Sequence, residues 1–165
     1  MFVVTVLFRV RPDAVTSAKA LAGGLPMGAL LAREEAAGAF EPGDHASTFG
    51  GGPLVASVAD AVLQVILADG FLEEVRAKGR LLRERLEAVA GASGLVDHVR
   101  GRGLMQGVVL TEPRAAEVTA DAAEAGLLVC PAGADVVRLV PPLVITPDEI
   151  DEAVGILGAV VAGTG

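Results

Sequence analysis

The segment LVDHVRGRGLMQGVVL, residues 95–110, decides the fold of the second half of this chain. Its two ends, 95–99 and 104–110, are rich in apolar and β-branched residues, which favours two strands. We interpret RGRG (100–103) between them as a tight connection, because glycine satisfies the backbone geometry of turns. A basic loop that binds an anion is the alternative for these four residues. The segment predicts a strand–turn–strand unit.

Two helices are predicted before this unit. Residues 54–68 follow Pro53, which suits a first helical position. Their surface is apolar nearly all round, so we expect this helix to be largely buried. In the second helix, residues 72–89, apolar side chains recur at alternating spacings of three and four. That spacing gives the second helix one apolar face.

A third helix, two more strands and a last helix are predicted after the unit. The third helix covers 114–125 and is closed by Gly126. Strands are expected at 127–130 and 136–140. The sequence TPDE (146–149) is a capping box that opens the last helix. This helix is predicted to carry one apolar face, formed by Ile150, Val154, Leu157 and Val161. This order of elements predicts an α+β layer, with helices on one face of a small antiparallel or mixed sheet.

The first 53 residues predict less regular secondary structure. Residues 2–8 are predicted to form a buried strand and 27–31 a second, shorter one. One or two helical turns are expected at 33–39. Residues 41–53 contain four glycines and two prolines, which indicates a loop.

Composition excludes several classes of function. The 165 residues suit one domain, or one domain with a remnant of another, and 52% hydrophobic residues support a sizeable core. The net charge of −8, without basic runs or interleaved aromatics, argues against nucleic-acid binding and against an anionic membrane surface. Residues 1–7 are too short to span a bilayer and lack the features of a signal peptide. We therefore expect a cytoplasmic protein.

The cysteine and the two histidines offer no site of their own. Cys130 is the only cysteine, which excludes an intrachain disulfide. We expect it to be a small buried core residue. His45 and His98 lie far apart in sequence without clustered ligands, so no metal site is predicted.

Lys19 is isolated within an apolar, glycine-rich stretch, and the next lysine is Lys78. An ammonium surrounded by apolar groups is costly to keep charged, which favours the neutral amine. A neutral amine can form a Schiff base with an aldehyde cofactor such as pyridoxal phosphate. On local residues alone, a surface lysine before a glycine turn is the simpler interpretation.

Two other stretches carry binding chemistry. Residues 45–53, HASTFGGGP, place Ser47 and Thr48 beside glycines, directly before a helix. Hydroxyls, close backbone N–H groups and a helix dipole suit a phosphate, although a plain capping loop has the same residues. Arg138 alternates with apolar neighbours on a predicted strand, and its planar fork suits a substrate carboxylate. A structural ion pair is the alternative for Arg138.

Five segments together resemble the class III pyridoxal-phosphate aminotransferases, and within them the acetylornithine aminotransferases. They are TSAKALAGGLPMGAL (16–30), PGDHASTFGGGPL (42–54), VRGRGLMQGVVL (99–110), GLLVCPAG (126–133) and VVRLVPPLVITPDEID (136–151). The resemblance implies an α/β fold of the fold-type I transferases. Residues 1–52 would be a remnant of the large cofactor-binding domain, and residues 53–165 the connecting helices and the C-terminal small α+β domain.

The resemblance also implies roles for four residues. Lys19 matches the lysine that forms the Schiff base with pyridoxal 5'-phosphate and then shuttles the proton. Thr48 matches the residue that reaches the cofactor phosphate in the neighbouring subunit of the family's homodimer, and Ser47 assists it. Arg138 matches the arginine that holds the substrate α-carboxylate.

The implied reaction is amino transfer from N-acetylornithine, or a similar amino acid, to 2-oxoglutarate, as in arginine biosynthesis. The N-terminal half of the family's active site has no counterpart here, including the acidic partner of the pyridine nitrogen, so we expect poor activity of this chain in isolation. A non-catalytic α+β association module is one alternative. Another class III enzyme, such as an ornithine or ω-amino acid transaminase or an aminomutase, is the other.

Overall fold

The computed structural model describes residues 10–163, which form two compact units divided after Asp69. The strand expected at residues 2–8 lies outside the described residues. The division falls later than the boundary expected after residue 52. Its position follows from packing, because the helix α3 (Pro53–Ile66) contacts the short 3-10 helix η1 (Lys19–Ala22) and therefore groups with the first unit.

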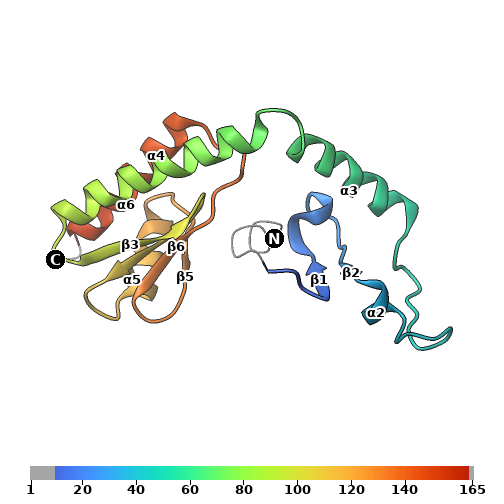
Figure 1. The fold of residues 1–165 in the computed structure, drawn as a ribbon. Coiled ribbons are helices and arrows are strands. Elements are labelled where there is room, and N and C mark those ends of the chain that lie inside the picture. Colours follow the sequence, from blue (N-terminus) through green and yellow to red (C-terminus); the bar gives the residue numbers. More distant parts are fainter. Residues whose placement is uncertain (1–9, 164–165) are drawn as a thin grey trace. The chain divides into compact units, whose positions relative to one another are not determined.

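The second unit has the predicted order of elements (Figure 1). It consists of α4 (Phe71–Ala92), β3 (Val96–Arg102), β4 (Met105–Leu110), α5 (Ala115–Glu124), β5 (Cys130–Pro131), β6 (Val136–Leu139) and α6 (Pro147–Gly163). The strands form one sheet in the order β3-β4-β6-β5, and all neighbours are antiparallel. The expected α+β layer is thus confirmed, with an antiparallel rather than a mixed sheet.

The connection expected at residues 100–103 is different in the structure. β3 continues through Arg100 and Gly101 to Arg102, which pairs with Met105 of β4. A Cβ on Gly101 would collide with the carbonyl oxygen of Met105, and Gly101 has a φ of +144°. Glycine at this position permits a close approach of two strands instead of ending one. The turn itself is confined to Gly103 and Leu104.

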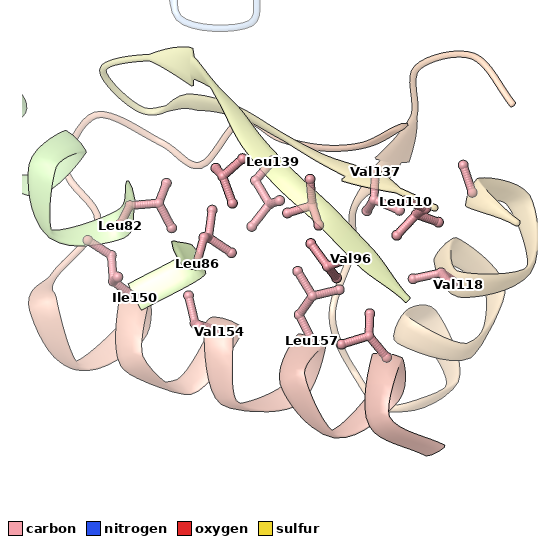
Figure 2. Packing of buried hydrophobic residues seen from close by; sticks show 14 of the residues in the cluster. Leu82, Leu86, Val96, Leu110, Val118, Val137, Leu139, Ile150, Val154 and Leu157 are labelled. Atoms are coloured by element: carbon pink, nitrogen blue, oxygen red, sulfur yellow. The ribbon is translucent and has the colours of Figure 1, made fainter. Parts of the chain in front are cut away.

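One face of the sheet forms the core of the second unit. Alternate residues of a strand point to opposite faces, and Val137 and Leu139 of β6 point to the same face as Val108 and Leu110 of β4. Figure 2 shows these side chains directed toward α6, where Leu157 is fully buried. The other core residues of the two long helices are Leu82, Leu86, Ile150, Val154 and Val161. The apolar face predicted for the last helix is confirmed.

The capping box at the start of α6 is formed as predicted. The backbone N–H and the hydroxyl of Thr146 donate to Glu149 Oε2 at 2.7 and 2.9 Å, and the Glu149 N–H donates to Thr146 Oγ1 at 3.3 Å. Both donors stabilise the ionised carboxylate, the backbone N–H more than the hydroxyl. They hold the pKa of Glu149 below its ordinary value.

This hydrogen bonding predicts a pH-dependent contribution to stability. Because the pKa of Glu149 is depressed in the folded state, its contribution is present above the unfolded pKa of about 4.3 and is lost as the pH falls through the folded value. We expect Glu149→Gln to flatten the acid limb of the free energy of unfolding, measured by urea denaturation from pH 6 down to about pH 3. Glu152→Gln on the same helix is the control, because Glu152 has no hydrogen bond or ion pair among the described residues. Equal slopes for the two variants would contradict the assignment.

The first unit is built from short elements. β1 (Ala14–Ser17) pairs antiparallel with β2 (Ala29–Ala32), η1 lies between them, and α2 (Glu34–Ala37) follows. Among the described residues of this unit only Ala22 and Ala59 are buried.

The helix expected at 54–68 exists as α3, but the expectation that it is largely buried is wrong for this chain. Leu54 is 73% exposed and Val65 56% exposed. Large apolar residues of the first unit such as Leu30, Phe40 and Phe49 are themselves exposed and do not cover the helix. Within residues 10–163, no single helix is long and apolar enough to cross a membrane; only α3 and α4 taken together, as a bent pair, meet the criteria of length and composition.

Candidate functional site

Lys19 lies at the start of η1, directly after β1, in a backbone conformation that is unusual for its residue type. Its φ is +60°, and it is the only non-glycine residue with a positive φ among residues 10–163. A side chain in this left-handed region costs roughly 1 kcal/mol or more, and such outliers cluster at functional sites. The strain thus points to Lys19 as a candidate for function.

The turn that carries Lys19 is anchored on α3. Gly23 closes η1 in the left-handed conformation and donates to the Ala20 carbonyl at 3.1 Å. Ala22 is fully buried, and a Cβ on Gly23 would lie 3.2 Å from Val62 Cγ2 of α3. These contacts fix the backbone beside Lys19. The side chain itself is exposed, so the apolar surroundings expected from the sequence are not formed by the described residues of this chain.

The predicted phosphate loop forms a hollow with the start of α3. The hollow has a volume of about 310 Å³ and is lined by Ser47, by 49–52, by 26–28 and by the first turn of α3. No side chain caps α3, which begins with Pro53 after Gly52. The free N–H groups of its first turn and the positive end of its dipole favour an anion. Ser47 adds a hydroxyl to the same hollow.

Thr48 lies in the same loop but does not line this hollow. It is exposed, as is His45, and neither side chain forms a hydrogen bond with another described residue. The role predicted for Thr48, contact with a cofactor phosphate in the neighbouring subunit, is therefore still a prediction.

Arg138 lies in β6, an interior strand of the sheet in the second unit. It pairs with Gly107 of β4 on one side and with Cys130 of β5 on the other. Its side chain is exposed, whereas those of Val137 and Leu139 are buried on the opposite face. The structural ion pair considered for Arg138 is absent among the described residues. A well-ordered backbone thus presents a free guanidinium, which can bind a carboxylate in a bidentate manner.

Cys130 is exposed in β5, so the expectation of a buried core residue is wrong. The physical reason is that β5 has only two residues and lies at the edge of the sheet.

The four candidate residues fall in different units. Lys19, Ser47 and Thr48 belong to the first unit and Arg138 to the second. Within residues 10–163, no three or more His, Cys, Asp and Glu side chains are grouped as metal ligands.

Sequence reasoning missed two features of these sites. Residues 26–28 line the hollow, although nothing in their composition marks them. Arg100 stands beside Gly107 on the same face as Arg138, which depends on strand register and is not readable from either segment alone.

Comparison with known proteins gives these features a context. The family model for aminotransferase class III matches residues 1–161. The acetylornithine aminotransferase of Gloeobacter violaceus is 51% identical over 154 residues, which are 93% of this chain and 38% of that protein. The chain therefore spans about two fifths of the length of the curated relatives that it matches.

Solved structures agree with the sequence match. The acetylornithine aminotransferase of Elizabethkingia anophelis has a TM-score of 0.83 and 34% identity, covering 93% of this chain and 41% of that one. That of Stenotrophomonas maltophilia has a TM-score of 0.86 and 37% identity, covering 97% and 42%. The predicted α/β fold, that of the C-terminal portion of these transferases, is confirmed. With a family model that spans nearly all its residues and relatives of the same fold, the chain belongs to the class III aminotransferases.

Proposed function

We propose that this chain is the C-terminal portion of a pyridoxal-phosphate-dependent transaminase that transfers an amino group from N-acetylornithine, or a similar amino acid, to 2-oxoglutarate. The observation that carries the proposal is the strained, exposed Lys19 on a turn anchored to α3. The names of the relatives support the choice of donor. We further propose that it works in the cytoplasm, in arginine biosynthesis, within a homodimer.

The residues present fit the cofactor at its two ends. Lys19 would provide an amine for the aldehyde carbon, and the uncapped start of α3 with Ser47 would provide donors for the phosphate of a cofactor held by the other subunit. When bound, pyridoxal phosphate supplies the electron sink for the bonds to the substrate α-carbon. Thr48 would donate to the phosphate of the other subunit's cofactor.

The remaining residues orient the substrate and move the proton. Arg138 holds the α-carboxylate through its planar guanidinium, which limits the substrate to one orientation. Lys19 Nζ would act as a general base toward the proton on the substrate α-carbon and as a general acid that delivers this proton to the cofactor carbon. The chain covers 38% of the length of a relative, so we expect little turnover when it is alone.

Covalent labelling tests the role of Lys19. After incubation with pyridoxal phosphate and reduction with borohydride, we expect the adduct to be found on Lys19 in clear excess over Lys78, the only other lysine. Lys19 is exposed on a turn anchored to α3, whereas Lys78 is half-buried on a regular helix. Peptide mass spectrometry gives the ratio directly.

Two variants sharpen this test. Lys19→Gln should abolish the excess, and Lys78→Gln should leave labelling of Lys19 unchanged. Equal labelling of the two lysines in the unmodified chain would contradict the proposal. It would instead favour the second candidate function, a non-catalytic association module.

The association module is supported by one observation in the first unit. Several of its large apolar side chains are exposed, among them Leu30 at 57%, Phe40 at 60%, Phe49 at 91% and Leu54 at 73%. Contiguous apolar surface of this kind drives association in water. The same exposure is compatible with the first candidate, because in a transaminase homodimer such a surface would be covered.

A further inference from the structure

The face of the sheet that points away from the helices carries its own set of residues. Arg100, Gly107 and Arg138 form one row across β3, β4 and β6, because Arg100 pairs with Gly107 and Gly107 pairs with Arg138. Val109 and Val136 lie on this face as well; both are buried, but neither belongs to the core cluster under the helices. The row therefore lies beside a buried apolar pair on the same face of the sheet.

Gly107 leaves the space between the two arginines free. A Cβ at this position would lie 3.1 Å from Val136 Cγ1 and 3.8 Å from Arg100 Cγ, so the stem of Arg100 already runs over the glycine. Neighbouring strands are about 4.8 Å apart, which places the backbones of Arg100 and Arg138 about 10 Å apart. Two arginine side chains can reach toward each other across that distance and hold the two ends of one small dicarboxylate.

Neither guanidinium has a partner among the described residues. Arg100 and Arg138 form no ion pair or side-chain hydrogen bond there, whereas Arg76, Arg83 and Arg85 are each paired with a carboxylate. The chain has 21 acidic residues against 13 basic ones, yet these two arginines on either side of one glycine have no carboxylate partner among the described residues. An anion between the two guanidinium groups would be attracted by both of them.

We propose that Arg100 is a second carboxylate-binding residue, which together with Arg138 forms a two-guanidinium site for a dicarboxylate. The identification of this ligand with the 2-oxo acid substrate rests on the proposed function. Each guanidinium takes one carboxylate through paired N–H donors, and Gly107 provides the gap that the carbon chain of the ligand crosses. The basic alternative for RGRG (100–103) thus gains a structural basis at Arg100, although these residues form a strand.

Arg102 provides a matched control. It lies on the same strand and the same face as Arg100, but it pairs with Met105 at the end of the hairpin, two residue pairs away from the row. It is exposed and has no ion pair or side-chain hydrogen bond among the described residues. A general attraction of anions to this face would depend on Arg102 as much as on Arg100.

The test is an NMR titration of the 165-residue chain with 2-oxoglutarate in the absence of pyridoxal phosphate. The arginine Nε–H signals are the readout. We expect Arg100→Gln and Arg138→Gln each to raise the dissociation constant about tenfold, and Arg102→Gln to change it less than about twofold, since a charge-assisted pair is lost only in the first two. Butyrate, which has one carboxylate, should bind more weakly than 2-oxoglutarate to the unmodified chain and lose little affinity in Arg100→Gln.

Three outcomes would overturn the inference. They are no saturable binding of 2-oxoglutarate by the unmodified chain, equal effects of Arg100→Gln and Arg102→Gln, and an affinity for butyrate equal to that for 2-oxoglutarate. Dispersion of the backbone amide spectrum verifies that each variant is folded. The titration contains no pyridoxal phosphate, so its result does not depend on Schiff-base formation at Lys19. Loss of selective labelling at Lys19 would thus refute the proposed function without affecting this result.

Discussion

Amide hydrogen exchange of this chain will separate its two units, with amides of α3 exchanging more than a thousandfold faster than those of α4 and α6. Among the described residues, 10–163, Ala22 and Ala59 are the buried ones of the first unit, and the other buried apolar side chains belong to the second. Amides in a unit with about 5 kcal/mol of stability exchange through its unfolding, whereas helices without a core open locally at little cost.

Exchange mass spectrometry of the complete chain measures this difference, with peptides from 53–66 compared with peptides from 71–92. The experiment needs two protein concentrations, because the exposed apolar side chains of the first unit can be covered by a second copy. Fast exchange in α3 at both concentrations agrees with the structure. Equal protection of α3 and α4 at the lower concentration would contradict it.

The second large effect is expected from Gly79→Ala. Gly79 is a buried residue of α4, and a Cβ there would lie 2.7 Å from the Cα and the carbonyl carbon of Gly103, in the β3–β4 turn. Alanine favours the helix by about 1 kcal/mol over glycine, but both atoms that it would meet belong to the backbone and cannot rotate away. We expect a net loss of about 2 kcal/mol in the free energy of unfolding, because overpacking costs more than the helix gains.

Gly155→Ala is the matched control for this substitution. Gly155 lies inside α6, is exposed, and has nothing within 4 Å of the added Cβ. The same change should therefore stabilise the second unit by about 1 kcal/mol, through helix propensity alone. Urea unfolding followed by circular dichroism gives both values. Stabilisation of both variants to the same extent would show that α4 and the turn are not in close contact.

Elements with local signals were predictable from the sequence. The last helix carried a capping box and an apolar face, and both are formed by residues within a few positions of one another. The periodicity of 72–89 likewise predicted which side of α4 is buried, including Gly79. Such signals depend on spacing along one element, which the sequence states directly.

Features that depend on distant residues were not predictable. The glycines at 101 and 103 indicated a turn over four residues, but the approach of Met105 draws Arg100 and Gly101 into the strand. Cys130 has the composition of a core residue and lies at an exposed edge. Apolar residues in α3 indicated burial without identifying what would cover them.

The candidate site was also predictable from the sequence only in part. Residue types and order were sufficient to select Lys19, Ser47, Thr48 and Arg138, because the resemblance rests on segments of sequence. The left-handed backbone of Lys19 and the place of Arg100 beside Gly107 required coordinates. A backbone angle and a strand register are set by tertiary packing, which no single segment encodes.

The pairing of β6 on both of its edges has a consequence for how this family can diverge. Removing one residue within β6 would turn every side chain beyond that point to the opposite face of the sheet. A guanidinium would then enter the hydrophobic core and a valine would face water. Because β4 pairs with one edge of β6 and β5 with the other, β6 has no unpaired edge at which a shift in register could be accommodated. Mutation can exchange the amino acid at position 138 in one step, but moving the arginine to a neighbouring position would require rebuilding the whole sheet.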